Sequence, residues 1–150
     1  LEYFEEIYKK LGTKFDFLFS TERLKSFAVS DIALAKSGTN TLEIAASGTP
    51  MIVGYKLNVL TYSMLKIFIK IKYANIINII SNKEVIPEYI QSNFTAHNIS
   101  YALSKLISNP NETSLQVESA KKILKTIGLD SNYLPSDKAA SIIFAMAADN

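Results

Sequence analysis

A Ser-Gly-Thr triplet occurs twice in the chain, at residues 37–39 and again at residues 47–49. An apolar run over residues 31–35 precedes the first copy and predicts a buried strand, while a helical pattern follows it. The first copy is therefore expected at the carboxyl edge of an α/β sheet, where ligands bind. Gly38 lets a ligand approach the backbone, and the flanking hydroxyls and free amides of a first helical turn suit a phosphate or diphosphate.

The residues between the two triplets also have a structural interpretation. Gly48, followed two residues later by Pro50, is a typical helix stop. Asn40 and Glu43 fit a capping box, in which Asn40 caps the helix and the Glu43 carboxylate bonds back to its amide. The alternative for Glu43 is ligand contact, because a carboxylate there can accept hydrogen bonds from two neighbouring hydroxyls of a ribose. The residues alone leave both interpretations open.

The composition narrows the chemistry that the chain can perform. Its 150 residues are 48% hydrophobic and 20% charged, which is typical of one globular domain. A net charge of +2, with lysines spread among glutamates, does not favour nucleic acid as a partner. Cysteine is absent and His97 is the single histidine, so a thiolate nucleophile and a cysteine or histidine metal cluster are excluded.

The most hydrophobic window, residues 57–80, is not expected to span a membrane. Lys66, Lys70 and Lys72 interrupt it, and each would cost about 2.5 to 3.5 kcal/mol at the centre of a bilayer. An apolar stripe along the helix expected over residues 59–71 has two interpretations, packing against the sheet or contact with a membrane surface or acyl chain. The stripe consists of Leu60, Met64, Ile67, Phe68 and Ile71.

Hydrophobic periodicity predicts a mostly parallel α/β arrangement over residues 1–94 and a helical tail over residues 95–150. The strand, short helix and strand within residues 31–56 form a βαβ unit. The other expected segments are a helix over 2–12, a strand over 14–20, a helix over 21–30, a helix over 59–71, a strand or buried extended segment over 73–80, and helices over 96–108, 112–128 and 138–148. Thr95 is expected to cap the first helix of the tail.

Two segments together carry a resemblance to a known family. The stretch "SDIALAKSGTNTLEIAASGTPMIVGYK" is followed at a fitting distance by "KYANIINIISNKEVIPEYIQ". Together they resemble the C-terminal half of the lipid-A-disaccharide synthase family, most densely over residues 30–110. The resemblance implies a Rossmann-like, partial second domain of a GT-B fold. It also implies a glycosyltransferase of lipid A biosynthesis, which moves diacylglucosamine from UDP-diacylglucosamine onto diacylglucosamine phosphate.

The resemblance assigns roles to seven residues by position. It implies that a turn holds the diphosphate, that a carboxylate holds the ribose, and that a second segment faces the donor sugar. These residues are, in that order, Ser37, Gly38 and Thr39; Glu43; and Asn78, Glu88 and Gln91. Glu88 and Gln91 are three residues apart after Pro87, so we expect them on one helical turn. This chain has Ile77 and Asn82 where the family usually has a proline and a glycine.

The resemblance also implies what must come from elsewhere. The acceptor domain, the proposed catalytic base and the first strands of the nucleotide domain would lie before residue 1. No catalytic residue is therefore assigned within this chain, and turnover by the chain alone is not expected. Without those strands, the strands over 14–20 and 31–35 would be left unpaired, so we expect a longer polypeptide or a partner to supply them.

The family's setting implies the bacterial cytoplasm, at the cytoplasmic face of the inner membrane, with peripheral membrane contact and a homodimer through the C-terminal helices. No cofactor and no metal are expected, since the UDP-sugar is a substrate. His97 matches no functional residue of the family and is expected at the surface. The alternatives are another GT-B enzyme that uses UDP-GlcNAc, or a non-catalytic α/β interaction module in which the first triplet only starts a helix.

Overall fold

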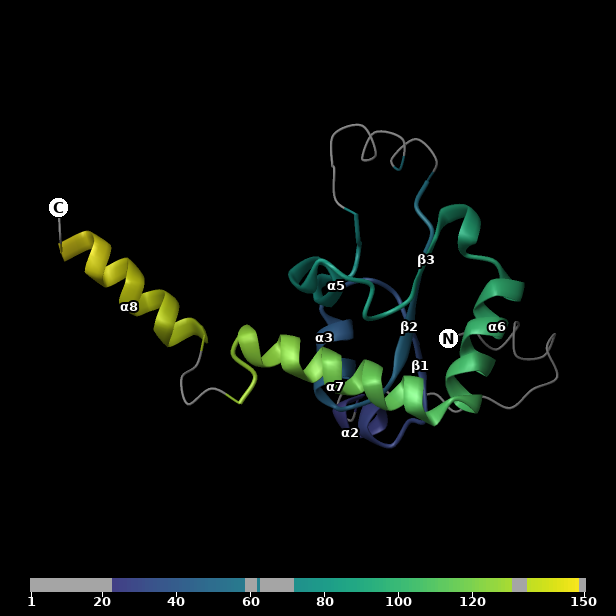
Figure 1. Ribbon diagram of the computed structural model, residues 1–150. Helices are drawn as coiled ribbons and strands as arrows, with labels where there is room; N and C mark the ends of the chain where they lie inside the picture. The colour runs from purple at the N-terminus through teal and green to yellow at the C-terminus, as the bar shows by residue number, and fades with distance from the viewer. Residues whose placement is uncertain (1–22, 59–61, 63–71, 131–134, 149–150) are drawn as a thin grey trace, which may run out of the picture.

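Three short parallel strands form the sheet at the centre of the structure (Figure 1). The computed structural model describes residues 23–58, 62, 72–130 and 135–148. Strand β1 (Ala33–Ala35) pairs with β2 (Met51–Tyr55), and β2 pairs with β3 (Glu88–Ile90), so the order is β1-β2-β3. The predicted α/β class with a parallel, Rossmann-like sheet is confirmed.

The βαβ unit predicted within residues 31–56 is present. Helix α3 (Asn40–Ala46) connects β1 to the parallel strand β2. The helix stops where the sequence predicted: Gly48 adopts a φ of +80°, and the Thr49 amide donates to Ile44 O at 3.2 Å. The second Ser-Gly-Thr triplet therefore ends a helix.

The capping box, one of the two interpretations of Asn40 and Glu43, is not present at the start of α3. Thr39 occupies the position before the helix, Asn40 is the first helical residue, and no side chain caps this end. The Glu43 carboxylate accepts a hydrogen bond from Arg23 Nη2 at 2.8 Å. Because Arg23 comes from another helix, no local sequence pattern indicated this partner.

Residues 73–80, predicted as a strand or extended segment, contain a helix. Helix α5 (Ile76–Ser81) begins after Asn75, whose Oδ1 accepts a hydrogen bond from Ile77 N at 2.9 Å. It ends at Asn82, which adopts a left-handed φ of +49°. Ile77 supplies an N–H that a proline would lack, and asparagine takes the left-handed conformation more readily than most residues. The two asparagines, rather than the apolar run, fix this segment as a helix.

The helical turn predicted to carry Glu88 and Gln91 is also wrong. Glu88 begins β3, whereas Gln91 begins the short 3-10 helix η2 (Gln91–Asn93) with a φ of +55°. Pro87 is compatible with a strand here, because a proline is tolerated where a strand begins. Its carbonyl accepts a hydrogen bond from Val53 N at 2.9 Å, which starts the pairing with β2. The two side chains therefore do not share one face of a helix.

Three helices follow the sheet in the described residues after position 95. Thr95 caps α6 (Ala96–Ser108) with its hydroxyl, as expected. Helices α7 (Pro110–Thr126) and α8 (Pro135–Ala148) each begin at a proline, a few residues earlier than predicted. A proline fits the first turn of a helix because the amide it lacks would have no partner there.

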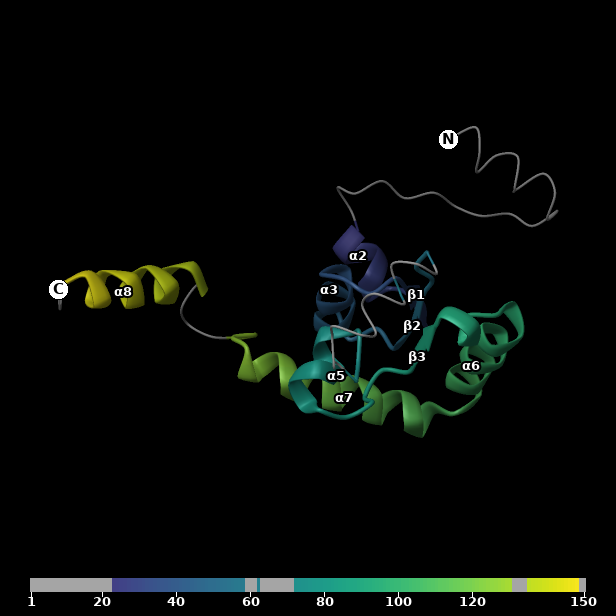
Figure 2. The ribbon, with the colours of Figure 1, turned by 90° about the horizontal axis from the view of Figure 1, so that it is seen from above.

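Strand β2 is buried on both faces and divides the core into two clusters. Met51 and Val53 lie in the cluster with α3, α5 and α7, whereas Ile52 lies in the cluster with α6. Figures 1 and 2 show α6 on one side of the sheet and α3, α5 and α7 on the opposite side. Helix α2 (Arg23–Ala28) packs against α3 and contributes Phe27 to the larger cluster.

Two side-chain hydrogen bonds fasten α7 to the start of β2. Gln116 Oε1 accepts from Met51 N at 2.8 Å, and Gln116 Nε2 donates to Met51 O at 3.0 Å. Gln116 is buried, so both bonds are shielded from water. The first part of the helical tail therefore belongs to the same core as the sheet.

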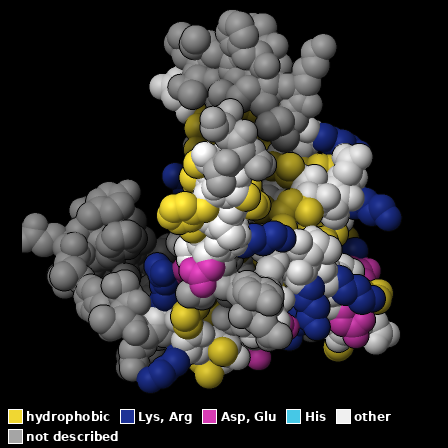
Figure 3. Space-filling view, turned by 90° about the vertical axis from the view of Figure 1, so that its left-hand side faces the viewer, with side chains coloured by type: hydrophobic (Ala, Val, Ile, Leu, Met, Phe, Trp, Pro, Cys, Tyr) yellow, Lys and Arg dark blue, Asp and Glu magenta, His cyan; other side chains and the backbone are white. Residues whose placement is uncertain are grey.

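Helix α8 stands apart from the other elements in both ribbon views (Figures 1 and 2). Its hydrophobic side chains are exposed, with Phe144 at 75% and Met146 at 68% of their full accessible area. In Figure 3, which faces the side where α8 projects, hydrophobic side chains gather in the upper middle of the surface. This helix therefore presents apolar surface to its surroundings.

Several predicted segments lie outside the described residues. They are the helix over 2–12, the strand over 14–20, and the helix over 59–71 with its apolar stripe. Among the helices that the structure describes, none is both long enough and apolar enough to cross a membrane.

Replacing Gly54 with alanine should destabilise the fold. A Cβ at this position of β2 would clash with the Cε2 atom of the Phe94 ring. We expect Gly54→Ala to lower the free energy of unfolding by about 1 to 3 kcal/mol, because the ring must shift within a packed core. Urea denaturation followed by circular dichroism measures this. Adding Phe94→Leu should recover part of the loss, and a wild-type midpoint for the single variant would contradict the packing described.

Replacing Gln116 with leucine should also destabilise the protein. The variant keeps the side-chain volume but leaves the amide and carbonyl of Met51 without these partners. We expect Gln116→Leu to lower the free energy of unfolding by at least about 2 kcal/mol. Glu118→Leu, at an exposed position of the same helix, is the matched control and should change it by less than about 0.5 kcal/mol. Equal effects of the two variants would argue against the role of Gln116.

Candidate functional site

The carboxyl ends of the three strands meet at one edge of the sheet, because the strands are parallel. The Ser-Gly-Thr turn follows β1 at this edge, and Gln91 follows β3. Gln91 Oε1 accepts a hydrogen bond from Leu57 N at 3.0 Å, just after β2. Gln91 therefore ties together the chain segments that leave β2 and β3, next to the strand that leads to the turn.

The turn after β1 is held by hydroxyls and leaves consecutive amides free. Ser37 Oγ donates to Ala74 O at 2.7 Å, and Thr41 Oγ1 donates to Gly38 O at 2.6 Å. Among the described residues, the amides of residues 38–40 donate no hydrogen bond. A Cβ added at Gly38 would meet no atom within 4 Å, so the approach to this backbone is open. Free amides on an open turn can bind an anion.

Glu43 has one engaged and one unpaired carboxylate oxygen. Its Oε1 accepts from Arg23 Nη2 at 2.8 Å, while Oε2 is buried and has no hydrogen-bond partner among the described residues. Buried polar atoms in folded proteins normally have a partner, so a lone acceptor of this kind suits the hydroxyl of a ligand. Arg23, which the sequence did not indicate, orients the group.

Glu88 lies in a network of hydrogen bonds with the segment that enters α5. Its Oε2 accepts from Ala74 N at 2.8 Å, and its Oε1 accepts from Asn75 N at 2.9 Å and from Asn78 Nδ2 at 2.7 Å. Three N–H groups thus surround one carboxylate. The network connects the first residue of β3 to the residue that Ser37 contacts.

Asn78 is completely buried, and its amide is engaged within the protein. Its Nδ2 also donates to Ile86 O at 2.7 Å, and its Oδ1 accepts from Val85 N and Ile86 N, each at 2.9 Å. These bonds fix the loop that leads from α5 to β3. The amide has no group left over for a ligand in this arrangement, so the structure gives Asn78 a position behind the edge of the sheet.

Two lysines that no sequence pattern indicated flank the segments that meet here, Lys36 directly before the turn and Lys72 two residues before Ala74. Lys36 immediately precedes the triplet, and its Nζ lies 5.0 Å from the centre of the Tyr55 ring. Lys72 Nζ lies at the same distance from the ring of Tyr73, just before Ala74. A cation over an aromatic ring is held in place without losing its charge. No group of three or more histidine, aspartate or glutamate side chains in the described part of the chain could hold a metal ion.

The structure thus brings some of the seven predicted residues together and leaves others apart. The turn, Glu88 and Asn78 are joined through the residues that precede α5, whereas Gln91 contacts the segment after β2 and Glu43 contacts α2. Ala74 and Asn75, which make the connection, were not predicted. Only the helix-cap pattern of Asn75 could have indicated them.

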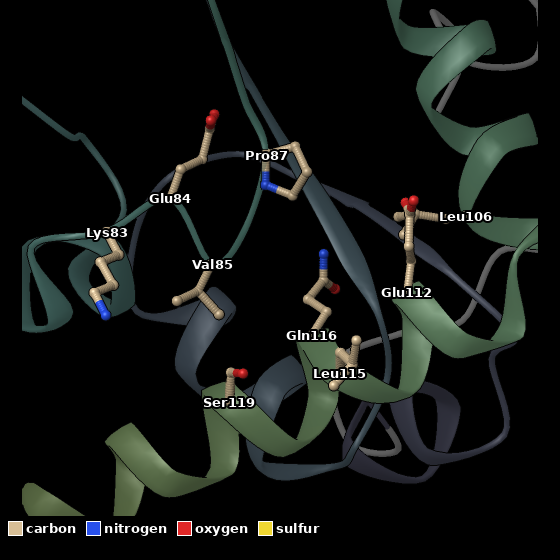
Figure 4. Close-up of a pocket in the computed structure, with 9 residues that line it drawn as sticks. All are labelled: Lys83, Glu84, Val85, Pro87, Leu106, Glu112, Leu115, Gln116 and Ser119. Carbon is tan, nitrogen blue, oxygen red and sulfur yellow. The ribbon is translucent and has the colours of Figure 1, made fainter.

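A separate cavity of about 340 Å³ lies toward the amino ends of β2 and β3 (Figure 4). Gln116 points toward the strand there, and Leu115 and Val85 line the same space. Glu112 also lines it, and its pairing with Lys105 at 2.9 Å raises the pKa of that lysine. None of the seven predicted residues lines this cavity, which lies away from the carboxyl edge.

Glu43 borders a second hollow, of about 280 Å³, between α3 and the end of α7. Apolar side chains form most of its wall, among them Leu42, Leu124 and Leu129. The glutamate is the single charged residue of this lining. Its carboxylate therefore stands between an apolar hollow and the cation of Arg23.

Comparison with known proteins identifies the family. The family model described as lipid-A-disaccharide synthetase matches residues 1–143. The lipid-A-disaccharide synthase of Rickettsia bellii (strain OSU 85-389) is 56% identical over 130 residues, which cover 87% of this chain and 34% of that protein. The synthase of Rickettsia prowazekii (strain Madrid E) is 55% identical over 131 residues, again 87% of this chain and 34% of the relative.

The lipid-A-disaccharide synthase of Rickettsia typhi (strain Wilmington) is 51% identical over 133 residues, or 88% of this chain and 35% of that protein. The chain spans about a third of the length of the curated relatives that it matches. The family model covers nearly all of the chain, and the relatives are more than 50% identical to it. Both findings point to the same family. The chain belongs to the lipid-A-disaccharide synthetase family.

Proposed function

We propose that this chain is the UDP-sugar-binding part of a glycosyltransferase that forms the lipid A disaccharide. In this reaction, diacylglucosamine moves from UDP-diacylglucosamine to diacylglucosamine phosphate. The observation that supports the proposal most strongly is the turn over residues 37–39, because its free amides lie at the edge of a parallel sheet where nucleotides bind in α/β proteins. Membership of the lipid-A-disaccharide synthetase family supplies the substrate class.

The diphosphate is the group that this part of the enzyme has to stabilise. As the bond to the sugar breaks, negative charge collects on the departing UDP. The amides of residues 38–40 supply fixed donors for that charge, and the cation of Lys36 lies one residue before the turn. The Ser37 hydroxyl already donates its hydrogen bond to Ala74 O, so toward the diphosphate its role is to shape the turn.

The other roles follow the geometry of each residue. Glu43 accepts hydrogen bonds from the ribose hydroxyls with its unpaired Oε2. Gln91 lies at the carboxyl edge and faces the donor sugar, whereas Asn78 and Glu88 lie behind that edge. The general base and the acceptor site lie outside this chain, in the part of the relatives that it does not match, together with strands that pair with the outer edge of β1.

The setting of the enzyme is part of the proposal. The reaction joins two acylated sugars, which suits work at a membrane surface, and the family setting assigns the cytoplasmic face of the inner membrane. The exposed apolar side chains of α8 support association between copies of the protein, because Ile143 and Phe144 are 66% and 75% exposed. A homodimer through the C-terminal helices would cover them.

UDP titration tests this function. We expect the folded chain to bind UDP in isothermal titration calorimetry, and Glu43→Ala to weaken binding roughly 10- to 100-fold, because hydrogen bonds to a charged acceptor are lost. His97→Ala is the control, since this side chain is exposed in the first turn of α6 and has no assigned role. The affinity of that variant should equal the wild-type value.

Three outcomes would contradict the proposal. If a demonstrably folded chain does not bind UDP, a non-catalytic interaction module becomes the better account. If Glu43→Ala binds as tightly as wild type, the ribose contact is wrong. Binding of UDP-GlcNAc but not of the acylated donor by a longer protein that contains the chain would favour another GT-B enzyme.

A further inference from the structure

The carboxylate of Glu88 is occupied by its own chain. It accepts hydrogen bonds from the backbone amides of Ala74 and Asn75 and from the side chain of Asn78, at 2.7 to 2.9 Å. Both oxygens are used. A carboxylate that already receives three N–H groups has little capacity left for a ligand hydroxyl.

Both backbone polar groups of Ala74, its amide and its carbonyl, form hydrogen bonds with side chains. Its amide donates to Glu88 Oε2 at 2.8 Å, and its carbonyl accepts from Ser37 Oγ at 2.7 Å. A continuous path of hydrogen bonds therefore runs from the first residue of β3 through Ala74 to the turn after β1. These segments are far apart in sequence, since Ser37 and Ala74 are separated by 37 positions.

Charge also argues against direct contact between Glu88 and the proposed ligand. A diphosphate and a carboxylate repel each other, and the repulsion is strong where water is partly excluded. The same carboxylate is favourable when N–H groups surround it and the anion binds beyond them. Glu88 is half-buried, which suits a group that acts from behind the turn.

We propose that Glu88 is a positioning residue of a nucleoside diphosphate site. It fixes Ala74, Ala74 fixes Ser37, and Ser37 sets the turn whose free amides face the diphosphate. The identity of the ligand rests on the proposed function; the path of hydrogen bonds does not. Glu88 therefore governs how the diphosphate is held, while the uridine part of the nucleotide is recognised elsewhere.

NMR of the chain without ligand tests the path itself. In Glu88→Gln, an NH₂ group replaces one acceptor, so the amide resonances of Ala74 and Asn75 should shift, and those of Gly38 and Thr39 should shift with them. Ser37→Ala perturbs the same path from its other end and should move Ala74. Glu118→Gln makes the same chemical change at an exposed position of α7 and should leave all four amides in place. Unchanged Gly38 and Thr39 resonances in folded Glu88→Gln would overturn the proposal.

Titration with UDP and with uridine tests the consequence for binding. We expect Glu88→Gln and Ser37→Ala each to weaken UDP binding roughly tenfold and to leave uridine binding unchanged. The double variant should lose much less than the product of the two losses, because both act through one path. Independent losses would mean that Glu88 contacts the nucleotide itself, and equal weakening of uridine would mean a general defect of the fold. Either result would overturn the proposal.

The NMR experiment and the titrations together distinguish failure of this proposal from failure of the proposed function. If the folded wild-type chain binds neither UDP nor uridine, the proposed function fails, and the role of Glu88 at a diphosphate site fails with it. If UDP binds and the turn amides respond to UDP but not to Glu88→Gln, the proposed function stands and the positioning role fails. If Glu88→Gln does not fold, Ser37→Ala and its effect on Ala74 decide the question.

Discussion

Burial of β2 on both faces is the constraint on which the rest of the structure depends. Its residues at positions 51–53 are at most 1% exposed, and side chains alternate between the two clusters of the core. A strand in this position must pair on both edges and must be covered by helices on both faces. Pairing with β1 and β3, and cover by α6 on one face and by α3, α5 and α7 on the other, satisfy these requirements. The parallel pairing then places the ends of all three strands, and the segments that follow them, at one edge.

Polar side chains hold both ends of the strands in place. Gln116 fixes the start of β2, Gln91 fixes the segment after its end, and Asn78 fixes the loop into β3. Each has a buried or half-buried side chain that pairs with backbone groups, which would otherwise lack partners. The exposed turn after β1 can then keep free amides. The surrounding polar groups are hydrogen-bonded and rigid, while the amides of the turn are free, and this arrangement is suitable for binding an anion.

The sequence predicted those features whose signals are local. Gly48 ends a helix and Thr95 begins one, and both act within a single turn of chain. The strand β3 was missed, because three residues that pair with β2 through Val53 and Glu88 form no periodic pattern. The helix α5 was mistaken for a strand, because a short apolar run has no period that distinguishes the two.

The candidate site residues could be predicted from the sequence, but their contacts with residues far away in the sequence could not. Family resemblance identified Ser37, Glu43 and Glu88, but not what each one contacts. Arg23 lies 20 positions from Glu43, and Ala74 lies 37 positions from Ser37, so only the folded chain reveals these pairs. Such contacts depend on which segments the sheet brings together.

The turn after β1 is proposed to bind the diphosphate of a UDP-sugar. An NMR titration of the isotope-labelled chain with UDP tests this binding site, because each backbone amide reports separately. We expect the amides of residues 38–40 to shift most with UDP and far less with uridine, and the amides around the cavity of Figure 4 to stay unchanged. Largest shifts at Val85 and Ser119, with the turn unaffected, would contradict it.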